Sequence, residues 1–128
     1  MKASEAIDKE TAALALRAER RRNRRYPCNI LSEAVARYRG SIFRGKIVDI
    51  SGSGCFLLTK AFLDLERYTE VDLSFKYKNV DYRTVALVMD IQLRRGVGFE
   101  FSFADAQTAQ VFLALSEEVS AATASARG

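Results

Sequence analysis

Two short polar strings carry side chains able to hold an anion. The first is an arginine run, in which only Asn23 interrupts Arg20, Arg21, Arg22, Arg24 and Arg25. The second, about 25 residues further on, is Asp49-Ile50-Ser51-Gly52-Ser53-Gly54. Arginine forks suit phosphate oxygens and the acceptor edge of guanine, and a short Asp/Ser/Gly turn offers compact polar groups and room for close backbone approach. Together they predict a site for an anion with a flat, hydrogen-bonding face, for which a nucleotide is the first candidate.

The composition argues against several kinds of catalytic and metal site. A chain of 128 residues with 48% apolar residues is long enough for one domain with a real core. It has no histidine, the commonest general base, and its two cysteines, Cys28 and Cys55, lie far apart in sequence, which argues against a zinc site. It has no apolar run of membrane-span length and no secretory leader, so we expect a cytoplasmic protein with free thiols.

The positive charge is uneven. Residues 1–25 hold eight Lys/Arg and four Asp/Glu, whereas residues 26–128 hold twelve of each, so the whole excess of four lies in the N-terminal arm. A neutral body argues against a broad basic face for duplex DNA and favours a small anion held at one place.

The elements that must position the two strings are mostly short strands. We expect a helix from Ser4 to about Glu19, and an arm that leads through Tyr26 and Pro27 into a strand, because the residue before proline is extended. Alternation and turn residues predict strands at 28–37, 44–50, 55–59, 70–78, 80–93 and 97–103, with an apolar-anchored connection at 61–68 carrying Phe62, Leu63 and Leu65. A helix is expected at 104–120, with Asp105 in its first turn, and a disordered tail at 121–128.

Several faces are predicted from the spacing. One face of the strand at 70–78 carries Val71, Leu73, Phe75 and Tyr77, and one face of the strand at 80–93 carries Val85, Leu87, Met89 and Ile91. In the strand at 97–103, the side chains expected in the core are Val97, Phe99, Phe101 and Phe103. Helical spacing aligns one face of the late helix, which carries Ala109, Phe112, Leu115 and Val119. Six strands with short turns and one late helix indicate an all-β fold with an appended helix, in which an antiparallel sheet closes into a small barrel.

In its two motifs and its strand pattern, the chain resembles a known family, the PilZ domain. Arg21-Arg22-x-x-Arg25-Tyr26-Pro27 is similar to its RxxxR motif, and Asp49-x-Ser51-x-x-Gly54 to its D/N-x-S-x-x-G motif. The segment 96–101 resembles its glycine-containing last strand, and the resemblance covers about residues 19–118. It implies a six-stranded antiparallel barrel with a C-terminal helix that binds cyclic di-GMP, a bacterial second messenger, without catalysis. It also implies an arginine arm that is mobile without ligand and wraps over it when bound.

The resemblance assigns the ligand to six residues: Arg21, Arg22, Arg25, Asp49, Ser51 and Gly54. Possible helpers are Arg20, Arg24, Tyr26, Gly52 and Ser53. The alternative register Arg20/Arg24 is open, and Arg21/Arg25 is preferred because Tyr26-Pro27 then follows the second arginine. Arginine can satisfy guanine O6 and N7, and Asp49 can accept from guanine N1–H and N2–H₂, a donor pair that adenine lacks. Arg94 and Arg95 are expected to form an exposed turn that could extend the rim.

The expected organisation is an N-terminal helix or flexible extension at 1–18, the barrel with its helix at 19–120, and the tail. We expect no enzyme activity, cofactor or metal, a downstream protein partner that receives a conformational signal, and a possible homodimer. Two alternatives stay open: an adaptor of the same fold that acts by protein contacts without ligand, and a small-barrel nucleic-acid binder that uses the basic arm. The second would show steep salt dependence and is disfavoured by the neutral body.

Overall fold

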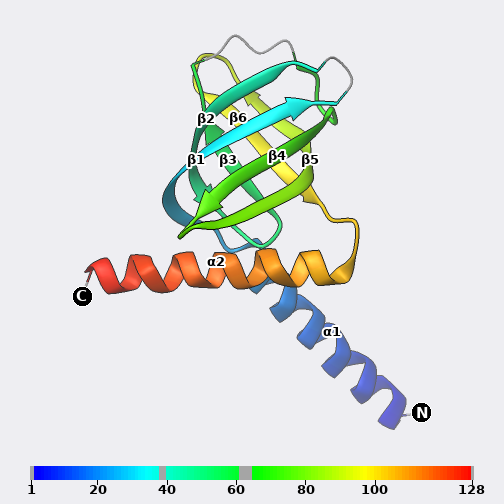
Figure 1. The fold of residues 1–128 in the computed structure, drawn as a ribbon. Coiled ribbons are helices and arrows are strands. Elements are labelled where there is room, and N and C mark those ends of the chain that lie inside the picture. The colour runs from blue at the N-terminus through cyan, green and yellow to red at the C-terminus, as the bar shows by residue number, and fades with distance from the viewer. Residues whose placement is uncertain (1, 38–39, 61–64, 128) are drawn as a thin grey trace.

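The strands close into a barrel with a helix at each end of the chain. The computed structural model describes residues 2–37, 40–60 and 65–127, except for the side chains of residues 2–10, 18, 21 and 125–127. The described elements are α1 (Lys2–Asn23), β1 (Tyr26–Ala36), β2 (Ile42–Ile50), β3 (Gly54–Leu58), β4 (Glu70–Tyr77), β5 (Val80–Gln92), β6 (Gly96–Ser102) and α2 (Ala106–Arg127). The strands pair antiparallel in the closed order β1-β2-β3-β6-β5-β4. In Figure 1, α2 lies across one end of the barrel and α1 leads away from that end. The predicted barrel with its C-terminal helix is confirmed.

Local sequence explains how the strands connect. At the β4–β5 hairpin, Lys78 and Asn79 both have positive φ, at 49° and 66°, as the tight primed turn requires. Closure leaves each described strand paired on both sides, because β1 also pairs with β4 through the register Ala34↔Leu73. On β4, Val71, Leu73 and Phe75 are buried, as their alternation predicts.

The predicted face of α2 seals the end of the barrel. Phe112, Leu115 and Val119 are at most 2% exposed. The ring of Phe112 meets those of Phe75 and Phe101, with centroids 6.1 and 4.9 Å apart. The rings of Tyr82 and Phe103 also meet that of Phe112, with centroids 5.9 and 5.2 Å apart, so burial of the apolar face fixes α2 on the barrel.

The ends of α2 differ from the sequence expectation. Asp105 precedes the helix and caps it: its Oδ1 accepts hydrogen bonds from Thr108 N and Thr108 Oγ1, each at 2.7 Å. The helix continues through Arg127, so the predicted disorder is wrong for 121–127, because this alanine-rich stretch favours helix. Thr123 Oγ1 also lies 3.3 Å from the carbonyl oxygen of Pro27, which fastens the extension to β1. Gly128 lies outside the described residues.

The predicted face of β5 is also wrong. The core residues of this strand are Ala86 and Val88, both 0% exposed, and not Val85 and Leu87. A register shift between Val88 and Asp90 interrupts the alternation, so the apolar pattern does not follow one face along the whole strand.

At the N-terminus, α1 runs further than the predicted end near Glu19. It includes the first part of the arginine run and ends at Asn23, because arginine is a good helix former and nothing breaks the helix before Pro27. Of the predicted connection, 61–64 with Phe62 and Leu63 lies outside the described residues, whereas Leu65 packs against the core. Neither described helix combines the length and the apolarity that crossing a bilayer requires.

Candidate functional site

The turn between β2 and β3 is built around Ser51. Its side chain is 1% exposed, and its Oγ accepts hydrogen bonds from Ser53 N at 3.1 Å and Gly54 N at 3.0 Å. Its own N–H donates to the carbonyl oxygen of Gly54 at 2.8 Å. A serine hydroxyl that binds backbone groups two and three residues on is a recurrent turn device. Ser51 therefore shapes the turn, and the predicted contact between Ser51 and a ligand remains a prediction.

Two glycines of the turn allow close approach of neighbouring backbone. A Cβ at Gly54 would overlap the carbonyl oxygen of Phe99 on the adjacent strand β6, so this buried glycine is required by barrel packing. A Cβ at Gly52 would lie 3.0 Å from the carbonyl oxygen of Arg22 and 3.1 Å from Leu113 Cδ1. Gly52 thus lets the end of α1 and one side of α2 rest on the turn.

The arginine run is divided between a helix and a short link. Arg20, Arg21 and Arg22 belong to α1, whereas Arg24 and Arg25 precede β1. The helix end is tied to the turn, because Ser53 Oγ donates to Asn23 Oδ1 at 2.6 Å. The side chains of Arg20, Arg22 and Arg24 are exposed, whereas the side chain of Arg21, a predicted ligand contact, lies outside the described part of the chain.

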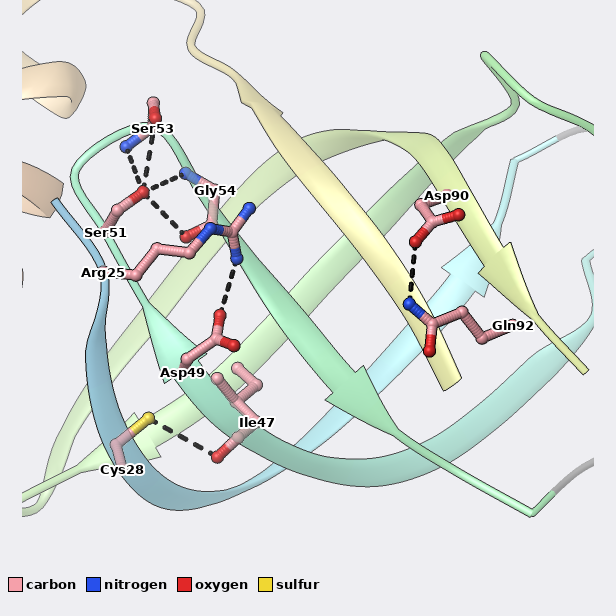
Figure 2. A network of polar contacts seen from close by, with 9 residues as sticks. All are labelled: Arg25, Cys28, Ile47, Asp49, Ser51, Ser53, Gly54, Asp90 and Gln92. Carbon is pink, nitrogen blue, oxygen red and sulfur yellow. Dashed lines mark hydrogen bonds and ion pairs between the residues drawn. The ribbon is translucent and has the colours of Figure 1, made fainter. Parts of the chain in front are cut away.

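Arg25 and Asp49 form the centre of the site. Arg25 Nη1 lies 2.6 Å from Asp49 Oδ1, and the two side chains are 51% and 34% exposed. Asp49 follows a register shift in β2 after Ile47, and such a bulge re-aims side chains. Figure 2 shows the guanidinium of Arg25 beside the Ser51 turn, with the carboxylate of Asp49 next to it. An ion pair this exposed is worth only about 0–1 kcal/mol, so a ligand can replace it at small cost.

This ion pair borders a groove of about 640 Å³, whose other side is formed by β3, β5 and β6. Here Gln92 Nε2 donates to Asp90 Oδ2 and Arg95 Nη1 donates to Gln92 Oε1, both at 2.9 Å. The guanidinium of Arg95 also lies 5.5 Å from the ring centroid of Phe56. The groove therefore offers a carboxylate, an amide, an aromatic ring and a second arginine opposite Arg25.

Sequence reasoning missed most of this second wall. It named Arg94 and Arg95 as a turn that could extend the ligand rim, and of these two Arg95 lines the groove, while its contact with a ligand remains a prediction. It did not single out Phe56, Asp90 or Gln92. The available signal was polar residues on the outer face of β5 next to the glycine-containing strand. That signal becomes readable only once the barrel order places β3, β6 and β5 side by side. Tyr26, a predicted helper, packs against the core.

The two thiols near the site are not reactive groups. Cys28 Sγ donates to the carbonyl oxygen of Ile47 at 3.4 Å, and burial, with a smaller effect of the Asp49 charge, raises its pKa to about 12. Burial raises the pKa of the fully buried Cys55 still further above the usual range. Among the described residues, no cluster of three acidic, cysteine or histidine side chains is placed to hold a metal ion.

Comparison with solved structures finds the same barrel in other proteins. The PilZ domain of CeSA from a cellulose-synthesizing bacterium has 18% identity and a TM-score of 0.67, and the match covers 77% of this chain and 99% of that one. The PilZ domain of YcgR from Escherichia coli, solved with cyclic di-GMP, has 11% identity and a TM-score of 0.66, covering 78% and 91%. The complex of K. pneumonia MrkH with cyclic di-GMP has 16% identity and a TM-score of 0.57, covering 67% and 45%.

Comparison with curated protein sequences returned no match. The model of the PilZ domain family matches residues 19–118, which include the arginine run, the Ser51 turn and the whole barrel. Because this match covers most of the chain, and the fold agrees, the chain belongs to the PilZ domain family.

Proposed function

We propose that this protein binds cyclic di-GMP in the groove between the Arg25–Asp49 ion pair and the Asp90–Gln92–Arg95 wall. The observation that carries the proposal is the exposed ion pair at the mouth of a groove of about 640 Å³. That volume lies within the range of about 300–1,000 Å³ typical of small-molecule sites. Membership of the family and the two cyclic di-GMP complexes with the same fold support the choice of ligand.

The chemistry divides between the partners of the ion pair. On binding, Arg25 turns its fork to guanine O6 and N7 or to a phosphate, and Asp49 accepts from guanine N1–H and N2–H₂. Arg21 and Arg22 supply further positive charge from the end of α1, and Arg20 and Arg24 flank them. Ser51, Gly52, Ser53 and Gly54 act by holding the turn in shape. No step of this proposal is catalytic, and it places the protein in the bacterial cytoplasm, where this messenger signals.

The signal is a change in α1. The end of this helix is held by the Asn23–Ser53 hydrogen bond and by close approach over Gly52. A ligand that draws Arg21, Arg22 and Arg25 into the groove pulls on that attachment. The reoriented helix then presents a different surface to a partner protein or to a second copy of the chain.

Calorimetric titration with cyclic di-GMP, with GTP and cyclic di-AMP as controls, tests the proposal. We expect saturable binding of cyclic di-GMP alone. Arg25→Ala is expected to weaken it about 5- to 150-fold, which corresponds to the roughly 1–3 kcal/mol of a bidentate arginine–guanine contact. Asp49→Asn should weaken binding in the same direction, because an amide cannot accept both guanine donors.

The chain contains a matched control. Arg37 Nε lies 3.0 Å from Asp72 Oδ1, with side chains 48% and 54% exposed, in an ion pair outside the groove. Arg37→Ala and Asp72→Asn should leave the affinity unchanged. Absence of cyclic di-GMP binding by the wild-type protein would refute the proposal. Binding to oligonucleotides that falls steeply with salt would favour the nucleic-acid alternative instead.

A further inference from the structure

A second and larger groove, of about 810 Å³, crosses the outer face of the barrel over β5, β4, β1, β2 and the end of β3. Seven lysines and arginines and two carboxylates line it, an excess of five positive charges. Residues 26–128 as a whole carry equal numbers of both signs. The fold therefore concentrates positive charge on one face of the barrel, and the negative charges that make residues 26–128 neutral overall lie mostly outside this groove.

Internal ion pairs neutralise only part of this charge. Arg44 Nε lies 3.0 Å from Glu33 Oε2, and Lys76 Nζ lies 3.9 Å from Asp81 Oδ1, so both carboxylates of the groove are used. Among the described residues, Lys46, Arg83 and Arg94 have no carboxylate within ion-pair distance. These exposed cations are therefore available to pair with negative groups of another molecule.

The groove also presents apolar side chains where a soluble face would usually be polar. Leu31 is 75% exposed and Leu58 is 41% exposed. Strand register places Lys46 directly between them, because it pairs with Leu31 on β1 and with Leu58 on β3. Two exposed leucines on either side of an unpaired lysine form a surface that is complementary to acidic and apolar groups in alternation.

We propose that this basic groove docks an acidic segment of a partner protein, in which apolar side chains that cover Leu31 and Leu58 alternate with Asp or Glu. Each described strand is paired on both sides, so the segment cannot add as a further strand and is recognised through side chains. A peptide is favoured over a nucleic acid for two reasons. The exposed leucines suit apolar side chains, and the rings of Phe75 and Tyr82 at this groove pack with Phe112, so they are not available to stack on bases. The hollowed shape favours a segment over a flat lipid surface.

Arg95 lines this basic groove as well as the smaller groove that holds Arg25 and Asp49. The two surfaces therefore meet at one side chain. Docking of the acidic segment does not require cyclic di-GMP, so failure of one proposal leaves the other standing.

Selection of a phage-displayed random dodecapeptide library on the full-length protein tests the inference. We expect selected peptides to be enriched in Asp and Glu that alternate with Leu, Ile, Val or Phe. The best peptide, measured by fluorescence anisotropy, should lose about tenfold or more in affinity for Lys46→Glu/Arg83→Glu, and weaken with salt. Leu31→Ser/Leu58→Ser should weaken it through lost apolar contact.

The control for charge is Arg67→Glu, which reverses one exposed arginine outside the groove, where its contact is with the ring of Tyr68. It should bind the peptide like the wild type. A wild-type circular dichroism spectrum and a cooperative thermal transition show that each variant is folded, whether or not the protein binds cyclic di-GMP. No acidic and apolar enrichment, or a selected peptide that binds Lys46→Glu/Arg83→Glu unchanged, would overturn the inference. So would binding of phosphatidylserine vesicles or oligonucleotides through Lys46 and Arg83 without any peptide enrichment.

Discussion

Ser51 shows how one residue type fits two roles that sequence alone does not separate. Its place in the D-x-S-x-x-G pattern indicated a ligand contact, but its hydroxyl is occupied by Ser53 N and Gly54 N within the turn. Of the residues predicted to bind the ligand, Arg25 and Asp49 are brought together, with Arg25 Nη1 2.6 Å from Asp49 Oδ1, and their contact with a ligand remains a prediction. The pattern did not distinguish the residues that face the groove from those that hold its wall.

Ser51→Ala is expected to destabilise the protein by about 1–3 kcal/mol, because it leaves the buried N–H of Gly54 without its acceptor. Ser53→Ala is the matched control: the Ser53 side chain is only half-buried and bonds to the exposed Asn23, so its loss should cost less than about 1 kcal/mol. Urea unfolding of both variants measures the difference. Equal stability of Ser51→Ala and wild type would contradict a turn-holding role.

At the scale of elements, alternation and helical spacing predicted the strands and the buried face of α2, because burial on one side imposes those periods. They failed where a second effect intervened. In β5 the register shift after Val88 breaks the period, and in α2 a stretch of small residues proved helical. Asp105 was assigned to the first turn of α2, whereas it stands one position earlier and acts as the cap.

Asp105→Ala is expected to lower the melting temperature at pH 7 by about 2–6 °C, because Thr108 N loses its capping acceptor. The hydrogen bonds from Thr108 lower the pKa of Asp105 below its ordinary value of 3.8. A carboxyl with a lowered pKa contributes stability above its unfolded pKa, and that contribution is lost as the pH falls through the folded pKa.

The difference between Asp105→Ala and wild type should therefore be complete above about pH 5 and shrink towards pH 2. Thermal scans followed by circular dichroism across this range measure it. Glu66→Ala removes a carboxylate from an exposed position and serves as the control for charge alone. A difference that is constant with pH would show that Asp105 does not act as a charged cap.

At the scale of the molecule, the charge distribution was the least predictable property. Counting charges along the chain indicated one basic arm and a neutral body. Closure of the barrel brings distant residues together, so that Lys46 on β2 and Arg83 on β5 line one groove although 37 positions separate them in sequence. Local patterns do not contain such pairings, because they follow from strand order.

Attachment of α1 to the Ser51 turn predicts a measurable movement on ligand binding. Spin labels are attached to cysteines introduced at two exposed positions, Leu14 on α1 and Val111 on α2, in a Cys28→Ser background. Pulsed electron paramagnetic resonance then measures the distance between the two labels. Cys55 is fully buried and stays unlabelled. Cyclic di-GMP is expected to shift the distance distribution, because its phosphates and guanines draw the arginines at the end of α1 towards the groove.

Gly52→Ala tests whether the turn transmits this movement. The added Cβ would lie 3.0 Å from the carbonyl oxygen of Arg22, which is tighter than most such contacts, so the end of α1 must move away from the turn. We expect a broader distribution without ligand and a smaller shift with it. Arg37→Ala is the control, because it alters an exposed ion pair outside the groove. If Gly52→Ala shows the same distance distribution and the same ligand-induced shift as the labelled protein without this substitution, the end of α1 does not rest on the turn in solution. The signal must then leave the groove through another element, and the wall that contains Arg95, which lines both grooves, is the leading candidate.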